Sequence, residues 1–229
     1  MQKNKYTIIV IATVIAVAVA GLAVYAIGRS DAIENRPSNA QSTTEERNAE
    51  NVSKYASLKG DAFDEAYIAD MLAHHEGAIS MSEMAGASSD RKEILDLSQN
   101  IMQSQSEELV RMQAWQAEWG YEKTMGGHAS HSGMGNEMSG TMMDMSKELE
   151  ALEGSDFDKK FLELMIEHHQ QAVGMSQYAD VNAKHQETKD LAKQIIGAQK
   201  AEIAQMQKWQ MEWGYVSADS GESMPGMNH

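Results

Sequence analysis

The chain has 229 residues, enough for one or two domains, and a formal net charge of −15 at pH 7. It contains no cysteine, which excludes disulfides and thiolate metal sites, and its acidic surface disfavours nucleic acid as a partner. Only two prolines, together with abundant Ala, Glu, Gln, Met and Leu, favour helices over sheets, so we predict an all-α protein.

Residues 8–27 form an unbroken apolar run, about as long as a helix that crosses a bilayer. Lys3 and Lys5 precede this run, so the positive-inside rule places the N-terminus in the cytoplasm. We interpret residues 1–28 as a single-pass membrane anchor, and a cleaved signal peptide is the alternative. Both interpretations put the rest of the chain on the extracytoplasmic side, periplasmic or extracellular.

The next segment, 29–60, is polar and has no periodic apolar face, which predicts a tether between membrane and domain. A helical hairpin is predicted over residues 61–121. Its first helix should start at Asp61, which would cap it, and Asp64 would add negative charge to the first turn. Apolar or small residues and one histidine then recur in steps of four and three, which indicates a buried helical stripe: Tyr67, Met71, His74, Ala78, Met81 and Ala85.

A break is expected around residues 86–89, and the second helix of this hairpin should start near Asp90. Gly120 is predicted to end it in the left-handed conformation. The sequence M-Q-x-W-Q-x-E-W-G-Y at its end occurs twice in the chain. The tryptophans of both copies are predicted to cap the ends of a helical bundle: Trp115, Trp119, Trp209 and Trp213.

Residues 122–154 are rich in Met, His and Gly and carry almost no other apolar residue. This composition does not predict a core, so we expect a flexible Met/His-rich linker with a short helix from Asp144 onward. Low-specificity capture of Cu(I) is our interpretation of this linker and of the tail, 216–229. A methionine oxidation sink and compositional drift are the alternatives.

An internal repeat is evident when the sequence is shifted by 94 residues. Residues 63–121 then align with 157–215 without a gap, and 23 of the 59 pairs are identical. A second hairpin is therefore predicted over 155–215, with Ser155 and Asp158 as a capping box. One hairpin buries too little apolar surface to be stable alone, whereas two can close a four-helix bundle.

Both hairpins carry the pattern M-x-x-H-H-x-x-A-x-x-M on their first helix. Thioether and imidazole without thiolate suit Cu(I) best, with Ag(I) or Cu(II) as further candidates, whereas Ca²⁺ and Mg²⁺ need more oxygen ligands. Adjacent histidines point about 100° apart on a helix, so a complete site needs ligands from another helix. The candidate metal ligands are Met71, His74, His75, Met81, Met165, His168, His169 and Met175. Further candidates on the second helices are Gln105, Glu108, Gln199 and Glu202.

Two other interpretations remain open. In the first, the histidines are structural, bond to Glu108 and Glu202, and the methionines only fill the core of a helical interaction module. In the second, the bundle is a ferritin-like redox enzyme. Di-iron sites need two E-x-x-H elements, and here Met71 and Met165 stand where those glutamates would be. The sequence has no recognisable nucleophile elbow or phosphate loop, so we expect no catalysis.

The chain resembles the domain-of-unknown-function family 305 (DUF305) in two motifs and their first-repeat counterparts. These are Met-Ile-Glu-His-His-Gln-Gln-Ala-Val-Gly-Met at 165–175 and Gln-x-x-Glu-Ile-x-x-Met-x-x-Trp at 199–209. The resemblance covers about 61–215. It implies a ferritin-like four-helix bundle and, in some members, binding of Cu(I), Cu(II) or Ag(I) through His and Met. In the first repeat Glu76 and Gly77 replace Gln170 and Gln171, so the two sites need not be equivalent.

Together these features predict a membrane-anchored extracytoplasmic protein that binds copper for sequestration or relay. Copper is the expected ligand, and a copper-handling protein is the expected partner.

Overall fold

The computed structural model describes residues 53–121 and 134–216, with side chains placed in all but 134–137. The predicted anchor at 8–27, most of the predicted tether and the linker histidines His128 and His131 lie outside the described residues. Within the described part no helix is long and apolar enough to cross a membrane.

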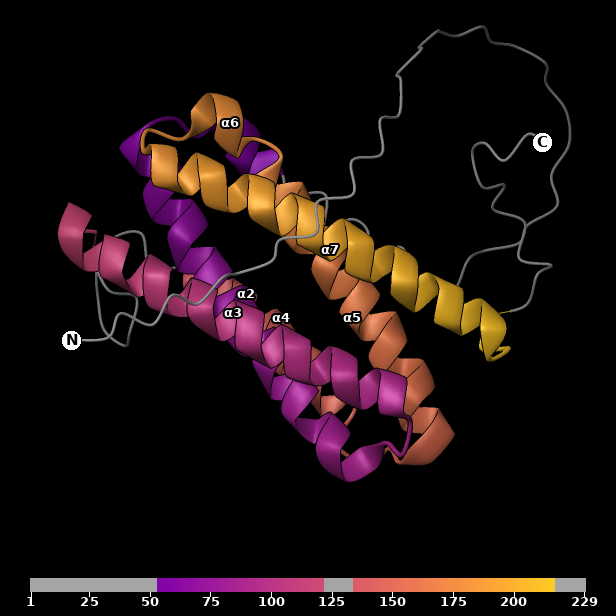
Figure 1. Cartoon of the computed structure of the whole chain (residues 1–229). Coiled ribbons are helices and arrows are strands. Elements are labelled where there is room, and N and C mark those ends of the chain that lie inside the picture. The colour runs from indigo at the N-terminus through magenta and orange to yellow at the C-terminus, as the bar shows by residue number, and fades with distance from the viewer. Residues whose placement is uncertain (1–52, 122–133, 217–229) are drawn as a thin grey trace, which may run out of the picture. The chain divides into compact units, whose positions relative to one another are not determined.

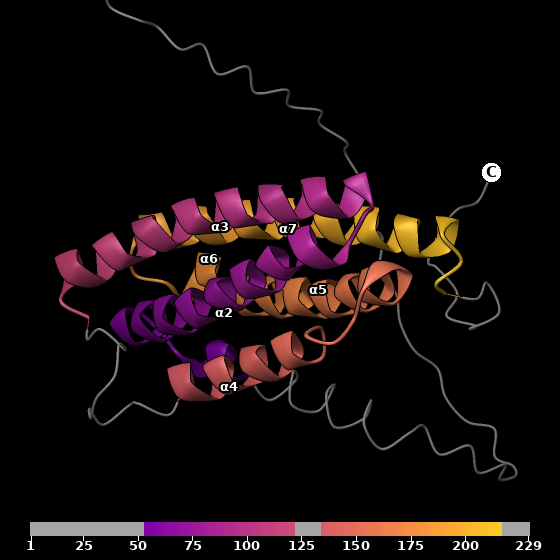
Figure 2. The same cartoon turned by 90° about the horizontal axis from the view of Figure 1, so that it is seen from below.

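The described residues are helical, with one isolated bridge between Gly60 and Ala183 and no β-strand, which confirms the all-α prediction. The first hairpin packs α2 on α3, the second packs α5 on α7, and the two hairpins meet through α2 and α5 (Figure 1). Figure 2 shows α3 and α7 in one layer, α2 and α5 in the next, and α4 beneath α2. The helices are α2 (Asp61–Ser88), α3 (Lys92–Trp119), α4 (Met134–Lys147), α5 (Gly154–Ser176), α6 (Ala179–Asn182) and α7 (Gln186–Glu212).

The predicted apolar stripe of α2 is fully buried at each of its six positions, His74 included. The helix continues through Gly86 to Ser88, so the break predicted around residue 86 comes about two residues later. Gly120 ends α3 with a φ of 75°, which confirms the predicted left-handed stop. Such a conformation strains residues that carry a Cβ and favours glycine.

The first-turn aspartates connect the two hairpins instead of capping their own helices. Asp64 of α2 accepts hydrogen bonds from the backbone N–H of Lys184, at 3.1 Å, and of His185, at 2.9 Å, just before α7. At the equivalent position Asp158 of α5 accepts a bond from Ser89 at 2.5 Å and pairs with Arg91 before α3. The predicted capping box of α5 is therefore wrong, because its aspartate bonds to the other hairpin.

The start of α2 also differs from the prediction. Asp61 is the first residue of the helix, but the cap position is Gly60, and no side chain of the described residues caps the first amides. The carboxylate of Asp61 accepts a hydrogen bond from Tyr121 at 3.0 Å and pairs with Lys184 at 2.7 Å. The side chain that was predicted to cap α2 therefore also joins the two hairpins.

Indole rings stack in pairs near the ends of α3 and α7, Trp115 on Trp119 and Trp209 on Trp213, and all four pack against the hydrophobic core. Trp119 carries His185 flat on its face, with centroids 3.7 Å apart and planes within 4°. The equivalent Trp213 carries the guanidinium of Arg91, 4.2 Å from the ring centroid. Each of these two indole faces is therefore covered by a side chain from the other hairpin. For Arg91 the contact is a cation–π interaction.

The predicted flexible linker is wrong for residues 134–147, which form α4. The buried apolar side chains described on this helix are Met138, Met142 and Met145, hereafter the α4 methionines, each at most 4% exposed. They join the main hydrophobic core, and α4 packs on α2. Together with the buried Leu149 they are spaced 4-3-4, which is the helical stripe that the glycine content obscured.

Gly77 is the position on α2 that allows α4 to approach closely. A Cβ at Gly77 would lie 2.7 Å from both Cβ and Cγ of Met142 and 2.8 Å from its sulfur. Cβ and Cγ are close to the backbone of α4, so a change of side-chain rotamer alone cannot relieve this clash. The equivalent position in the second repeat is Gln171, and the close approach is therefore a property of the first repeat.

We expect Gly77→Ala to destabilise the protein by about 1–3 kcal/mol, because overpacking forces α4 away from α2. The matched control is Gly86→Ala in the same helix, where a Cβ would meet nothing within 4 Å. This control should stabilise by about 0.5–1 kcal/mol through helix propensity. Urea unfolding and hydrogen exchange of residues 134–147 provide the measurement. Equal stability of the two variants would contradict the close approach.

Candidate metal centre

Helices α2 and α5 meet at His74 and His168, which occupy equivalent positions in the two repeats. The Nε2 atom of each ring lies 2.9 Å from the backbone carbonyl oxygen of the other histidine. Their ring centroids are 3.5 Å apart, and both side chains are fully buried. A carbonyl oxygen can only accept, so Nε2 carries the hydrogen in each ring and Nδ1 keeps its lone pair when the ring is neutral.

The neighbouring histidines face the second helix of their own hairpin. His75 Nε2 lies 2.6 Å from a carboxylate oxygen of Glu108, and His169 Nε2 lies 2.6 Å from one of Glu202. Both imidazoles are fully buried, while the glutamate side chains are 13% and 26% exposed. An ionised carboxylate only accepts, so the hydrogen again sits on Nε2. The hydrogen bonds to Glu108 and Glu202, which the interpretation of structural histidines predicts, are therefore present.

The Nδ1 atoms of the four histidines remain without a role in this packing. We refer to these residues as the paired histidines: His74, His75, His168 and His169. Each Nδ1 atom is buried and has no hydrogen-bond partner among the described residues. A metal-binding histidine has this arrangement, because its other ring N–H donates to a carbonyl or carboxylate that fixes the tautomer and the ring orientation.

Two glutamines add further acceptors at equivalent positions of α3 and α7. The side chains of Gln105 and Gln199 are 3% exposed, and their Oε1 atoms likewise have no partner in the described part of the chain. Lone pairs buried without donors are costly unless a donor or a cation supplies the missing interaction. The paired histidines and these two glutamines thus hold six buried acceptor atoms without a partner in the described part of the chain, four Nδ1 and two Oε1.

Burial also sets the protonation state at the helix crossing. It lowers the pKa of His74 and of His168 well below the usual value near 6.5, and the neighbouring imidazoles lower it further. Both rings are therefore neutral at neutral pH. A metal ion binds the neutral form of imidazole, so these rings need to release no proton on binding.

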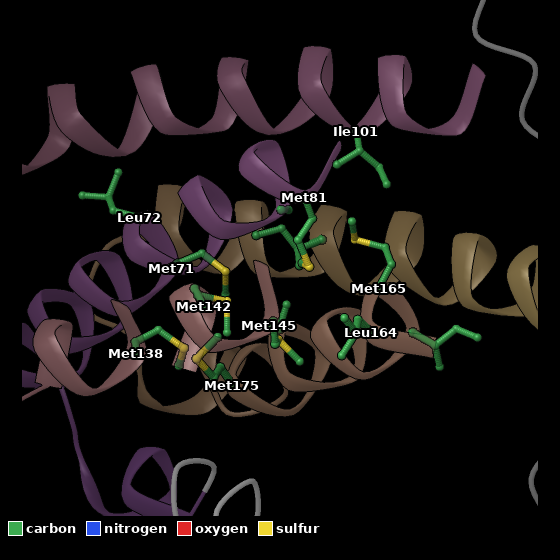
Figure 3. Packing of buried hydrophobic residues seen from close by; sticks show 14 of the residues in the cluster. Met71, Leu72, Met81, Ile101, Met138, Met142, Met145, Leu164, Met165 and Met175 are labelled. Atoms are coloured by element: carbon green, nitrogen blue, oxygen red, sulfur yellow. The ribbon is translucent and has the colours of Figure 1, made fainter. Parts of the chain in front are cut away.

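The four predicted methionine ligands are buried on the same two helices. Met71 and Met81 lie on α2, Met165 and Met175 lie on α5, and none is more than 1% exposed. Figure 3 shows Met81 and Met165 near each other, and Met71 on the side of Met175. All eight predicted site residues are thus fully or almost fully buried on α2 and α5.

Histidine and carboxylate alone do not complete a site in this part of the molecule. No group of three or more His, Asp or Glu side chains that could hold a metal ion is present among residues 53–121 and 134–216. A three-coordinate or four-coordinate ion would therefore need thioether sulfur or amide oxygen as well. Thioether favours Cu(I) and Ag(I) over Zn²⁺ or Mg²⁺.

Comparison with protein families gives one match, to the model described as a domain of unknown function, DUF305. The match extends over residues 29–115 and 64–210, which together cover most of the chain. The chain belongs to the DUF305 family. A search of curated proteins gives no match.

Solved structures similar to this DUF305 chain include copper-bound proteins. CopM in its Cu(II)-bound form is 32% identical, with a TM-score of 0.54, over 68% of this chain and 99% of CopM. CopM in its Cu(I)-bound form is 30% identical, with a TM-score of 0.53, over 66% and 96%. A DUF305 protein from Streptomyces coelicolor is 26% identical, with a TM-score of 0.58, over 66% and 94%.

Two features of this DUF305 chain were not predicted from the sequence. One is the reciprocal bond between each crossing histidine and the opposite carbonyl, since it depends on how α2 and α5 meet. The other is the contribution of α4 to the core beside α2. For α4 a signal existed in the 4-3-4 spacing of its buried residues.

Proposed function

We propose that this DUF305 protein binds copper, as Cu(I), in a buried site between α2 and α5. The candidate ligands, from which a three- or four-coordinate ion would take its donors, are the paired histidines through Nδ1 and Met71, Met81, Met165 and Met175. The observation that carries the proposal is that every paired histidine is fixed through Nε2 and has a buried Nδ1 with no hydrogen-bond partner among the described residues. A purely structural histidine needs its Nε2 bond, but it gains nothing from an unsatisfied Nδ1.

The similarity to CopM supports the choice of metal. CopM has been solved with Cu(I), with Cu(II) and with Ag, and it is 29–32% identical to this chain in those forms. The buried thioethers and the absence of cysteine favour the monovalent ions for this chain. A buried site of this kind binds the ion and shields it from water, and we propose no catalytic role.

Sequestration or relay outside the cytoplasm is the role that fits such a site best. The apolar run at 8–27 supports an extracytoplasmic domain held at the membrane. A copper-handling protein would be the partner in a relay. The bundle could accept the ion in a ferritin-like arrangement of its four long helices, with ligands from both hairpins.

Anaerobic titration of residues 30–229 with Cu(I) against a competing chelator tests the proposal. We expect binding of the folded protein to be stronger than that of the same protein in urea. The unfolded chain keeps every His and Met residue but loses their arrangement. Equal, weak uptake by the folded and unfolded protein would reject the proposal and favour the structural role of the histidines.

A further inference from the structure

Three aromatic rings lie in contact with one another at the C-terminal end of α3. Trp115 and Trp119 are stacked, with centroids 5.4 Å apart and planes within 9°. The ring of Tyr121 follows in an edge-on contact, 5.8 Å from that of Trp119. All three rings are partly buried against the hydrophobic core. Aromatic rings at such separations are in contact, so an electron can pass along them in short steps.

The phenol of Tyr121 has an acceptor for its proton. Its hydroxyl donates a hydrogen bond to the carboxylate of Asp61 at 3.0 Å. His185 Nδ1 lies 3.3 Å from the same hydroxyl, but it also lies 2.7 Å from a carboxylate oxygen of Asp64. A carboxylate only accepts, so Nδ1 carries a hydrogen and cannot take the phenolic one. Hydrogen bonds from Lys184 and Tyr121 lower the pKa of Asp61, which is therefore ionised at neutral pH.

Oxidation of Tyr121 therefore has a route for the proton as well as for the electron. Burial and the bond to Asp61 raise the pKa of Tyr121 above its usual value near 10, so the phenol is protonated at neutral pH. Once a phenol has lost an electron, it is a far stronger acid than a carboxylic acid. Its proton can then pass to Asp61 along the existing hydrogen bond, and this transfer makes the oxidation more favourable.

The second repeat has the same three rings in different surroundings. Trp209 and Trp213 stack at 5.5 Å, and Tyr215 follows at 5.7 Å. The hydroxyl of Tyr215 is buried and has no hydrogen-bond partner among the described residues, and serine stands at the position equivalent to Asp61. The guanidinium of Arg91 lies 4.2 Å from the Trp213 ring, and its fixed charge opposes a second positive charge on that indole. The second repeat is therefore a matched control without the proton acceptor.

We infer that Trp115, Trp119 and Tyr121 form a redox-active aromatic chain that ends in a tyrosyl radical, with Asp61 as the proton acceptor. A one-electron oxidant, such as a peroxide-derived radical, takes one electron from the indole of Trp115. Trp119 and then Tyr121 each give one electron to the preceding ring, and the phenolic proton moves to Asp61. The oxidant is thus reduced by one electron, the tyrosine becomes a neutral radical, and the carboxylate becomes a carboxylic acid.

This chain would draw oxidation away from the buried methionines of the core, which become polar when they are oxidised to the sulfoxide. It needs no metal ion, so the inference goes beyond the proposed function and does not depend on it.

Flash photolysis of the metal-free full chain in detergent tests the aromatic chain. Photoexcited tris(bipyridine)ruthenium(II), with an irreversible cobalt(III) electron acceptor, generates a ruthenium(III) oxidant, and electron paramagnetic resonance of frozen samples detects the radicals. Tyr121→Phe should lose most of the tyrosyl signal. The matched control, Tyr215→Phe, should keep the signal of the wild type. Equal tyrosyl signals from these two variants would overturn the inference.

The role of the proton acceptor is tested with Asp61→Asn, which keeps an oxygen that can accept the phenolic hydrogen bond but is not a base. The Asp61 side chain is 58% exposed, so this substitution should leave the helix content unchanged. The tyrosyl signal should fall to that of Tyr121→Phe, and a tryptophan radical should persist instead. In the wild type the tyrosyl radical should form more slowly in heavy water than in ordinary water. A wild-type radical yield in Asp61→Asn, or equal rates in the two solvents, would reject the inference.

Discussion

Replacing the four paired histidines by glutamine is expected to lower the Cu(I) affinity by more than about 100-fold while the fold is retained. Loss of a partner that only orients a metal-binding histidine already costs about 10–100-fold, and here the ligands themselves are removed. Glutamine can donate a hydrogen bond from its amide nitrogen, as Nε2 of histidine does. It has no lone pair where Nδ1 of the imidazole lies.

The same variant separates a metal-binding role from a structural one. Under the structural interpretation, glutamine restores the bonds to the His74 and His168 carbonyls and to Glu108 and Glu202. The Cu(I) affinity would then stay as in the wild type. Circular dichroism should show the wild-type helix content, and chelator competition should show the loss of affinity. The control is His185→Gln, because that ring stacks on Trp119 away from the paired histidines. Wild-type affinity in the fourfold variant would overturn the assignment of Nδ1 as a ligand.

The internal repeat explains why much of the fold could be predicted from the sequence. A stripe in steps of four and three, present twice, specifies which face of α2 and α5 is buried. Six of six stripe positions on α2 are indeed fully buried. Glycine in the left-handed region marks the end of α3 for a local, steric reason. Both signals are local, and local signals are readable without knowledge of the tertiary contacts.

The errors concern residues whose partners lie on the other hairpin. Asp64 and Asp158 look like helix-start residues, yet they bind the segments before α7 and α3. Their partners are 121 and 67 residues away, and no local pattern encodes that pairing. The identity of the partners differs between repeats as well, since His185 in one corresponds to Arg91 in the other. Only the three-dimensional contacts show that both aspartates bind the opposite hairpin.

Composition misled the interpretation of residues 134–147, where glycine and polar residues suggested a linker. The α4 methionines nevertheless form an apolar helical stripe, and this stripe packs on α2 where Gly77 leaves room for Met142. At the candidate site, too, some features could be predicted from the sequence and others follow only from the fold. The residue types and spacing identify all eight candidates, but the hydrogen on each Nε2 follows from contacts that only the fold provides.

Acidification is expected to destabilise the metal-free protein through His74 and His168. Burial lowers the pKa of both rings in the folded state below the unfolded value near 6.5. Below that pH the unfolded chain therefore binds more protons than the folded chain. The free energy of unfolding then falls as the pH falls, and it is fully retained above about pH 7. Between pH 7.5 and 5.5 each ring should cost about 1.4 kcal/mol, so the pair should cost about 2–3 kcal/mol.

The double variant His74→Gln/His168→Gln isolates this contribution from that of every other titrating group. Glutamine keeps a donor for each opposite carbonyl but cannot be protonated, so the difference in stability between pH 7.5 and 5.5 should shrink by about 2–3 kcal/mol. Urea unfolding at both pH values, with the wild type beside the variant, measures it. An unchanged difference would mean that the two rings take up protons in the folded state, which a fully buried pair of imidazoles in contact should resist. The same resistance would keep both Nδ1 atoms available to a soft cation at mildly acidic pH, where an exposed histidine is already protonated.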